Sequence, residues 1–202
     1  MNKERNVGPW RVARERAAFE NPWIKIVDHA VVHPDGTSGE YGVVQFKNLA
    51  IGVLPFDETG MVTLVGQHRF PHDTYSWELP EGGGALGVEP LESAKRELAE
   101  ETGINAQNWA PLSAFDVSNS VTDERAVCFF AWGLSNGAAA PEPSEALTLK
   151  QVSFKALLDM VMSGEITDSL TIVMVLTALA KALRGEAPAP ISAHILASVP
   201  RK

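Results

Sequence analysis

One stretch of the sequence, Glu78 to Ile104, constrains the fold of this chain more than any other. It reads ELPEGGGALGVEPLESAKRELAEETGI, which is typical of a strand end, a glycine-rich loop, a helix and a glycine stop. Pro90 suits the first position of a helix, and Gly103 suits its end because glycine tolerates the left-handed conformation there. The stretch therefore predicts a helix from Pro90 to Glu101.

The predicted helix carries an apolar stripe and an acidic stripe. At helical spacing the apolar stripe consists of Leu91, Ala94 and Leu98. The acidic stripe consists of Glu97, Glu100 and Glu101. Such close carboxylates repel one another, and a divalent cation would remove the repulsion because Mg²⁺ prefers hard oxygen ligands. Taken alone, the spacing also fits a solvated acidic face beside Lys95 and Arg96.

The glycine loop also satisfies the pattern G-x-G-x-x-G from Gly82 to Gly87, the outline of a dinucleotide fingerprint. A dinucleotide loop offers a pyrophosphate the positive end of a helix, whereas this helix carries three glutamates on one face. The chain also lacks the alternating strands and helices of such a sheet, and no Gly-Lys-Ser/Thr follows the loop. A dinucleotide fold is therefore not expected.

Composition excludes several other classes of protein. The 202 residues are 45% hydrophobic, which favours one domain with a sizeable core, and the net charge of -8 argues against a nonspecific nucleic-acid binder. The single cysteine, Cys128, lies in an apolar run, excludes an internal disulfide framework and suits the cytoplasm. No segment reads as a secretory signal, and the oily run Leu170 to Leu183 is too short to span a membrane.

The remaining pattern alternates strands and turns before and after the central helix. Strands are expected at Trp23–His33, Glu40–Phe46, Ala50–Phe56, Met61–Gln67, Tyr75–Leu79, Trp109–Val117, Arg125–Trp132 and Leu149–Phe154. Two late helices are expected at Phe154–Met162 and Asp168–Arg184, the second capped by Thr167 or Asp168. Mixed strands, one helix in mid-chain and late helices favour an α+β fold or an α/β/α sandwich.

The fixed residues of the central stretch resemble the Nudix box, the pyrophosphatase signature G-x5-E-x7-R-E-U-x-E-E-x-G-U in which U is a bulky apolar residue. The matching residues are Gly82, Arg96-Glu97-Leu98, Glu100-Glu101 and Gly103-Ile104. Val88 departs from the box, since it stands where the first glutamate belongs, with Glu89 one place late. Segments outside the box resemble the ADP-ribose and nucleotide-sugar branch: Trp77-Glu78-Leu79-Pro80, Gln67-His68-Arg69, Glu124-Arg125 and SGEITD from Ser163 to Asp168.

The resemblance, which runs from about Pro22 to Leu183, implies an architecture. It implies a Nudix α/β/α sandwich with an N-terminal β-hairpin extension. We expect an arm and hairpin over residues 1–47, the Nudix domain over 48–184 and a flexible tail over 185–202. In this branch such an N-terminal sheet commonly packs on a second subunit, so the resemblance implies a homodimer.

A metal site is expected at the acidic stripe, with Mg²⁺, or Mn²⁺ in its place. Glu97 and Glu101 are assigned as direct ligands one turn apart, and Glu100 as a further ligand or water anchor. By resemblance, the backbone carbonyl of Glu81 completes the site, and the Glu81 side chain is expected to be incidental. Arg96 is expected to hold the glutamates in position, and Val88 cannot pair with it.

The other expected site residues serve the water and the substrate. By resemblance, Glu124 is a general base or an auxiliary ligand, with Glu100 as the alternative base and plain loop solvation as the other reading. Arg69 is expected to contact phosphate because a guanidinium can grip two of its oxygens, although a surface arginine has the same pattern. Trp23 is the candidate for contact with the nucleobase.

The expected reaction is metal-dependent hydrolysis of a nucleoside diphosphate linked to a sugar, ADP-ribose or another nucleotide sugar. Its products would be a nucleoside monophosphate and a sugar phosphate. Two alternatives remain: hydrolysis of nucleoside triphosphates or dinucleoside polyphosphates, and a low-turnover nucleotide-binding sensor, which Val88 motivates. The resemblance implies a small-molecule nucleotide-sugar substrate. The acidic net charge argues against nucleic acid as a partner, and no segment suggests a membrane.

Overall fold

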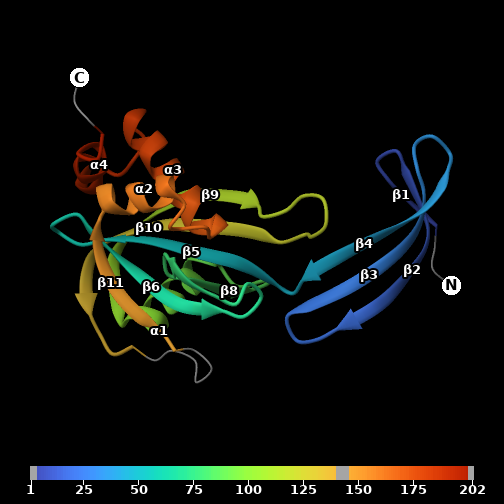
Figure 1. Ribbon diagram of the computed structural model, residues 1–202, viewed down its shortest axis with the longest axis horizontal. Helices are drawn as coiled ribbons and strands as arrows, with labels where there is room; N and C mark the ends of the chain where they lie inside the picture. The colour runs from blue at the N-terminus through green and yellow to red at the C-terminus, as the bar shows by residue number, and fades with distance from the viewer. Residues whose placement is uncertain (1–3, 140–145, 200–202) are drawn as a thin grey trace. The chain divides into compact units, whose positions relative to one another are not determined.

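The structure of the chain is a computed structural model that describes residues 4–139 and 146–199 (Figure 1). The first three residues of the expected arm and the last three of the expected tail lie outside it. The chain divides into two compact units. The N-terminal unit comprises Met1–Leu49 and Asp116–Arg125, and the main unit comprises Ala50–Phe115 and Ala126–Lys202.

The N-terminal unit contains an antiparallel sheet in the order β1-β2-β3-β4. Its strands are β1 (Arg5–Val7), β2 (Trp10–Glu20), β3 (Ile24–Val32) and β4 (Ser38–Phe46). The expected hairpin is present as β3 and β4, whereas the expected arm instead forms β1 and β2. Only Val12 of β2 is buried, and two register shifts interrupt its pairing with β3. The side chains of β2 show no alternation of buried and exposed positions, so only its backbone pairing identifies it as a strand.

The main unit is built on a mixed sheet in the order β11-β6-β5-β10-β9, with β7 beside β6 and β8 beside β5. The strands are β5 (Asn48–Phe56), β6 (Met61–Arg69), β7 (Thr74–Glu78), β8 (Glu81–Ala85), β9 (Ile104–Asp116), β10 (Arg125–Asn136) and β11 (Thr148–Ser153). β5 and β10 are parallel, whereas β6 is antiparallel to β11 and β7. Part of the expected glycine loop forms β8, because Gly84 lets the backbone approach β5: a Cβ there would lie 2.7 Å from Ile51 Cγ1.

Helices cover both faces of this sheet, as Figure 1 shows. They are α1 (Pro90–Thr102), α2 (Phe154–Ser163), α3 (Ser169–Leu183) and α4 (Ala189–Leu196). α1 lies on one face against β8 and β6, and the other three helices gather on the opposite face and contact one another. The expected α/β/α sandwich with N-terminal antiparallel strands is therefore confirmed.

The core of the main unit lies between the sheet and its helices. Its fully buried side chains include Phe56, Phe130, Phe154, Leu54, Leu64 and Leu98. Cys128 is buried among them, and burial raises the pKa of its thiol to about 12, which makes it an inert core residue. No helix within residues 4–139 and 146–199 combines the length and apolarity needed to cross a bilayer.

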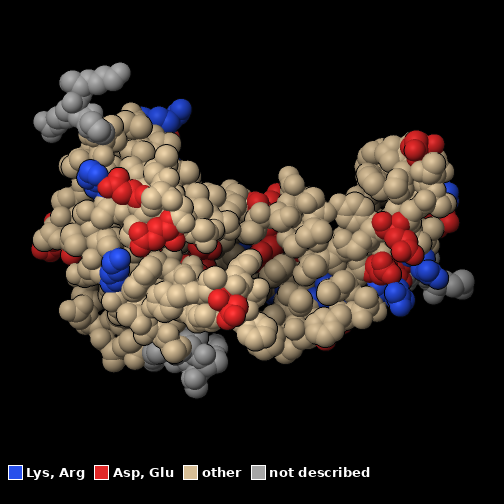
Figure 2. Space-filling model, in the orientation of Figure 1, with Lys and Arg blue, Asp and Glu red and all other residues tan. Residues whose placement is uncertain are grey.

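Charged side chains are dispersed over the face that Figure 2 shows. On that face the described Lys and Arg residues lie in scattered groups among Asp and Glu, without a continuous basic surface. This dispersion accords with a net charge of -8.

The segment expected to be a flexible tail instead contains α4. Its alanines and prolines read as loose chain, yet proline is well suited to the first turn of a helix, where Pro190 lies. Ile191 and Ile195 are buried, and α4 contacts α2 and α3. The helix is thus part of the packed sandwich.

Burial of Ile195 predicts a stability effect. Ile195→Ala should lower the free energy of unfolding by about 2 to 4 kcal/mol, because the side chain is 0% exposed and its loss leaves a cavity. The adjacent Leu196 is 39% exposed, so Leu196→Ala should change stability by about 0.5 kcal/mol or less. Urea unfolding of both variants tests this, and equal midpoints for the two would contradict the packing of α4.

Candidate active site

The turn between β7 and β8 is held in place on three sides. Its hydrogen bonds run from Leu79 N to Thr171 Oγ1 (2.9 Å), from Val53 N to Pro80 O (2.9 Å) and from Glu81 N to Glu101 Oε2 (3.1 Å). These partners come from α3, from β5 and from α1. The backbone of Glu81 is therefore fixed between the sheet and the acidic face of α1.

Two of the three box glutamates are buried where α1 meets this turn. Glu97 is 8% exposed and Glu101 is 5% exposed, and they lie one helical turn apart. Glycine is required at position 82, because a Cβ there would lie 2.3 Å from Glu97 Oε2. The structure thus places Glu101 at the backbone N–H of Glu81 and Glu97 against Gly82, and the roles of these groups as metal ligands stay predictions.

Arg96 braces the acidic face, as expected. It donates to Glu100 Oε2 (2.6 Å) and to the backbone oxygen of Gly83 (2.7 Å), and it also bonds Glu97. Glu100 is consequently drawn toward Arg96, with 38% of its side chain exposed. Of the three glutamates, Glu100 is the one at the solvent edge.

Val88 and Glu89 stand outside this arrangement. Both side chains are exposed, and Glu89 occupies the N-cap position of α1 without a side-chain capping bond. Arg96 takes its three partners from Gly83, Glu97 and Glu100. Val88 cannot pair with Arg96, and these three groups bind Arg96 without it.

Arg69 anchors a second acidic cluster on the opposite side of the turn. Its Nε donates to both oxygens of Glu78 (2.9 and 3.1 Å), and its Nη2 bonds Glu78 and Glu81 Oε1, the latter at 3.0 Å. These hydrogen bonds raise the pKa of the guanidinium, so Arg69 stays charged. Within the described residues its Nη1 makes no such bond, which leaves one edge of the guanidinium for a ligand.

Asp168 completes this cluster. It caps α3 by accepting from Thr171 N (2.6 Å), which confirms the expected cap. In the part of the chain that the structure describes, Glu78, Glu81 and Asp168 form the one acidic trio whose ligand atoms all lie within 4.8 Å of one another. Sequence reasoning missed Glu78 and Asp168 as site residues. For Glu78 a signal was available in the sequence, because a glutamate at a buried position of a strand is unusual.

The Glu81 side chain is not incidental, contrary to expectation. Among the residues that the structure describes, its buried Oε2 atom has no hydrogen-bond partner. Burial raises the pKa of the Glu81 carboxyl well above its ordinary value of 4.5, and the carboxylates of Asp168 and Glu78 raise it further, against the effect of Arg69. Glu81 therefore joins two clusters, its backbone facing α1 and its carboxyl facing Arg69.

The remaining two predicted residues belong to the N-terminal unit. Glu124 is half-buried in the loop between β9 and β10, and burial raises the pKa of its carboxyl, with a further rise from Asp123. Trp23 lies between β2 and β3 with 66% of its surface exposed, and Asn21 Oδ1 accepts from its backbone N–H (2.9 Å). Their roles stay predictions.

The donor set fits a divalent cation. Buried carboxylates are unfavourable unless positive charge compensates them, and Arg96 supplies such a charge to Glu97 and Glu100. Glu97 sits in a cradle that a Cβ at position 82 would fill, which keeps its carboxylate against the turn. The groups that could hold the ion are Glu97, Glu101 and the backbone of Glu81, with Glu100 at the edge.

This fold and this acidic helix define a hydrolase of the Nudix type. Residues 46–167 match the family model described as the NUDIX domain, and residues 10–44 match the model described as the nucleoside diphosphate sugar hydrolase N-terminal domain. The chain belongs to the Nudix family, and the prediction of an enzyme of this family is confirmed.

Known proteins agree with that assignment. An ADP-ribose pyrophosphatase of Bacillus subtilis is 30% identical over 79% of this chain and 86% of its own length. An ADP-ribose pyrophosphatase of Mycobacterium tuberculosis is also 30% identical, over 70% of each chain. A crystal structure of an ADP compounds hydrolase superposes with a TM-score of 0.79 at 14% identity, covering 90% of this chain and 98% of that one, and supports the fold.

The raised pKa of Glu81 predicts how stability depends on pH. The folded protein retains a proton that the unfolded chain releases, so the free energy of unfolding falls as pH rises above 4.5 toward the raised pKa. Glu81→Gln cannot lose a proton in this pH range, so the fall in the free energy of unfolding should disappear. The amide oxygen can still accept a hydrogen bond from Arg69. The melting temperature of Glu81→Gln in EDTA should exceed that of the unchanged protein at pH 8, and the gap should narrow as the pH approaches 4.5.

Glu92→Gln is the matched control. Glu92 is an exposed glutamate of α1 that pairs with Lys95, so this change should show no such pH-dependent gap. A constant gap for Glu81→Gln between pH 4.5 and pH 8 would contradict the proton assignment.

Proposed function

We propose that this protein hydrolyses the pyrophosphate bond of a nucleoside diphosphate linked to a sugar, ADP-ribose or another nucleotide sugar, in a Mg²⁺-dependent reaction. The products are a nucleoside monophosphate and a sugar phosphate. The observation that carries the proposal is the buried pair Glu97 and Glu101 against the turn at Glu81. The N-terminal match to nucleoside diphosphate sugar hydrolases and the names of the two pyrophosphatase relatives support the substrate class.

The metal role falls to the carboxylates of Glu97 and Glu101, with Glu100 and the Glu81 carbonyl completing the set. Bound Mg²⁺, or Mn²⁺, supplies positive charge that offsets the negative charge of the diphosphate oxygens. Arg96 keeps Glu97 and Glu100 in place through its hydrogen bonds. The helix then presents its oxygens in one fixed arrangement, which limits the reorganisation needed for catalysis.

Arg69 binds a phosphate oxygen in this proposal. Glu78 and Glu81 grip its Nε and Nη2, so the guanidinium is held in one orientation with Nη1 toward the ligand. Such a fixed cation loses little side-chain freedom when substrate binds.

Water activation is assigned to Glu124, with Glu100 as the alternative base. The raised pKa of Glu124 makes its carboxylate a better proton acceptor than an ordinary glutamate. Trp23 is the proposed nucleobase contact because its indole is exposed in the N-terminal unit. We further propose a homodimer that acts in the cytoplasm, as the resemblance to this branch implies.

The direct test is product formation from a panel of ADP-ribose, UDP-glucose, GDP-mannose, dinucleotides and nucleoside triphosphates, with and without Mg²⁺. We expect metal-dependent release of a nucleoside monophosphate from a sugar-linked member. Glu97→Gln and Glu101→Gln should each abolish turnover, because an amide is a weaker ligand than a carboxylate, while some nucleotide binding remains. Glu92→Gln, on an exposed position of the same helix, should leave turnover unchanged.

Other outcomes of the panel select the alternatives. Activity confined to nucleoside triphosphates or dinucleotides would show that these compounds, and not nucleotide sugars, are the substrates. Tight Mg²⁺-dependent nucleotide binding without product would favour the sensor that the exposed Val88 motivates.

Gly82→Ala provides an independent test of the metal site. The added Cβ would lie 2.3 Å from Glu97 Oε2 and must displace this carboxylate. The Mg²⁺ concentration for half-maximal activity should rise by about 10- to 100-fold, as for other changes that disturb ligand placement. Gly42→Ala is the control, because a Cβ there meets nothing within 4 Å. An unchanged Mg²⁺ requirement in Gly82→Ala would argue against Glu97 as a ligand.

A further inference from the structure

The loop between β9 and β10, residues 117–124, is bound to strand β4 by backbone pairing. Val44 N donates to Val121 O (2.9 Å), Asp123 N donates to Val44 O (3.2 Å), and Val44 forms a parallel bridge with Thr122. This loop therefore adds a short strand-like segment to the N-terminal sheet. It also carries Glu124 immediately after the paired residues.

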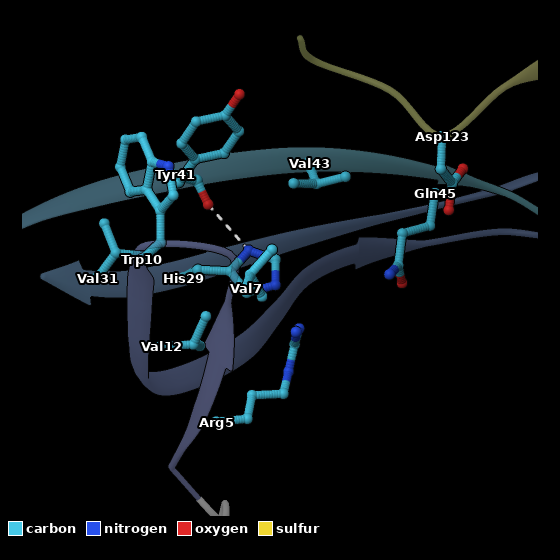
Figure 3. Close-up of a pocket in the computed structure, with 10 residues that line it drawn as sticks. All are labelled: Arg5, Val7, Trp10, Val12, His29, Val31, Tyr41, Val43, Gln45 and Asp123. Carbon is cyan, nitrogen blue, oxygen red and sulfur yellow. Dashed lines mark hydrogen bonds between the residues drawn. The ribbon is translucent and has the colours of Figure 1, made fainter. Parts of the chain in front are cut away.

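Two side chains reinforce the pairing. The carboxylate of Asp123 accepts from Phe46 N (2.7 Å), and the hydroxyl of Tyr41 donates to the backbone oxygen of Ser120. The partners in these two bonds are 77 and 79 residues apart in the sequence. Figure 3 shows Asp123 next to Gln45 of β4, where both residues line a cavity of about 370 Å³ together with Tyr41. β4 thus holds residues 120–123 of the loop.

Bonds inside the loop transmit this attachment to Glu124. Val117 N donates to Glu124 O (2.9 Å), Glu124 N donates to Thr122 Oγ1 (3.3 Å), and Thr122 Oγ1 donates to Ser118 O (3.2 Å). The backbone of Glu124 is therefore bonded at both its N–H and its carbonyl. The residues that β4 holds directly precede Glu124 in the sequence.

We propose that the N-terminal sheet positions Glu124 for catalysis, and that Asp123 is the positioning residue through which β4 does so. The inference deepens the proposed function, because it rests on Glu124 as the group that activates water. A general base must lie within hydrogen-bond reach of its proton, and a displacement of about 1 Å can cost about 10²-fold in rate. An unattached loop of this length would sample many conformations, whereas the bonds to β4 select one.

The contribution of Asp123 is tested with steady-state kinetics at saturating Mg²⁺. Asp123→Ala removes the acceptor for Phe46 N and should lower kcat by about 10- to 100-fold, with KM changed by no more than about twofold. Asp123→Asn keeps an oxygen acceptor at the same place and should restore kcat to within about threefold. Tyr41→Phe, which removes only the bond to Ser120, should give a smaller loss of kcat than Asp123→Ala.

Asp35→Ala is the matched control. Asp35 Oδ1 accepts from the backbone N–H of Thr37 (2.9 Å) in the turn between β3 and β4, so this variant loses a bond of the same kind without touching the loop. Its kcat should equal that of the unchanged protein. A loss of kcat in Asp35→Ala as large as in Asp123→Ala would overturn the proposal, since the effect would then reflect general loosening of the sheet.

Two further measurements separate this inference from the proposed function. Amide hydrogen exchange in residues 117–124 should quicken in Asp123→Ala while the α1 amides stay protected, and this readout needs no substrate. In Glu124→Gln, adding Asp123→Ala should cost nothing more, because both changes act through one group. Unchanged exchange, faster exchange with normal kcat, or additive losses in the double variant would each overturn the positioning role. Absence of hydrolysis in the unchanged protein would instead overturn the proposed function.

Discussion

The burial of Glu97 and Glu101 against the turn at Glu81 is the interaction on which the rest of the site depends. Two carboxylates removed from water destabilise a fold unless donors or cations compensate them. Arg96 and the backbone N–H of Glu81 supply part of that compensation. Helix and turn are therefore interdependent. The helix supplies the negative charge and the turn supplies hydrogen-bond donors. Glycine at position 82 leaves room for the Glu97 carboxylate, which a Cβ there would meet.

Glu81 makes the two acidic clusters of the main unit one electrostatic system. Its backbone N–H bonds Glu101, while its carboxyl meets Arg69, Glu78 and Asp168 on the other side of the turn. Burial and the neighbouring carboxylates raise the pKa of that carboxyl, so a proton there reduces the negative charge behind the turn. Arg69 then serves both the structure and the proposed phosphate contact, since the groups that hold it also orient it.

Sequence and structure agree where the determinants are local. The helix, its acidic face and the glycine at position 82 follow from spacing within one stretch, and these parts were predictable. Asp168 was predictable only as a helix cap, because its neighbours Glu78 and Glu81 are distant in sequence and no pattern links them. β2 was missed because backbone pairing defines it, and α4 because its prolines read as loose chain although they begin a helix.

The least predictable feature is the membership of residues 116–125 in the N-terminal unit. The segment lies inside the NUDIX match at residues 46–167, yet it bonds β4, of which all but the last residue precedes that match. A family match covers a continuous stretch of sequence, whereas a compact unit is defined by contacts in space. The two boundaries differ where a loop pairs with a strand that is distant in the sequence. The loop that carries Glu124 is therefore bonded partly by Tyr41 and Val44, which lie within the nucleoside diphosphate sugar hydrolase N-terminal domain, and partly by Phe46, the first residue of the NUDIX match. If Glu124 activates water, that N-terminal domain is part of the catalytic apparatus as well as an addition to the Nudix fold. Changes that remove the bonds of Tyr41, Val44 or Phe46 to the loop should then alter the rate of the chemical step.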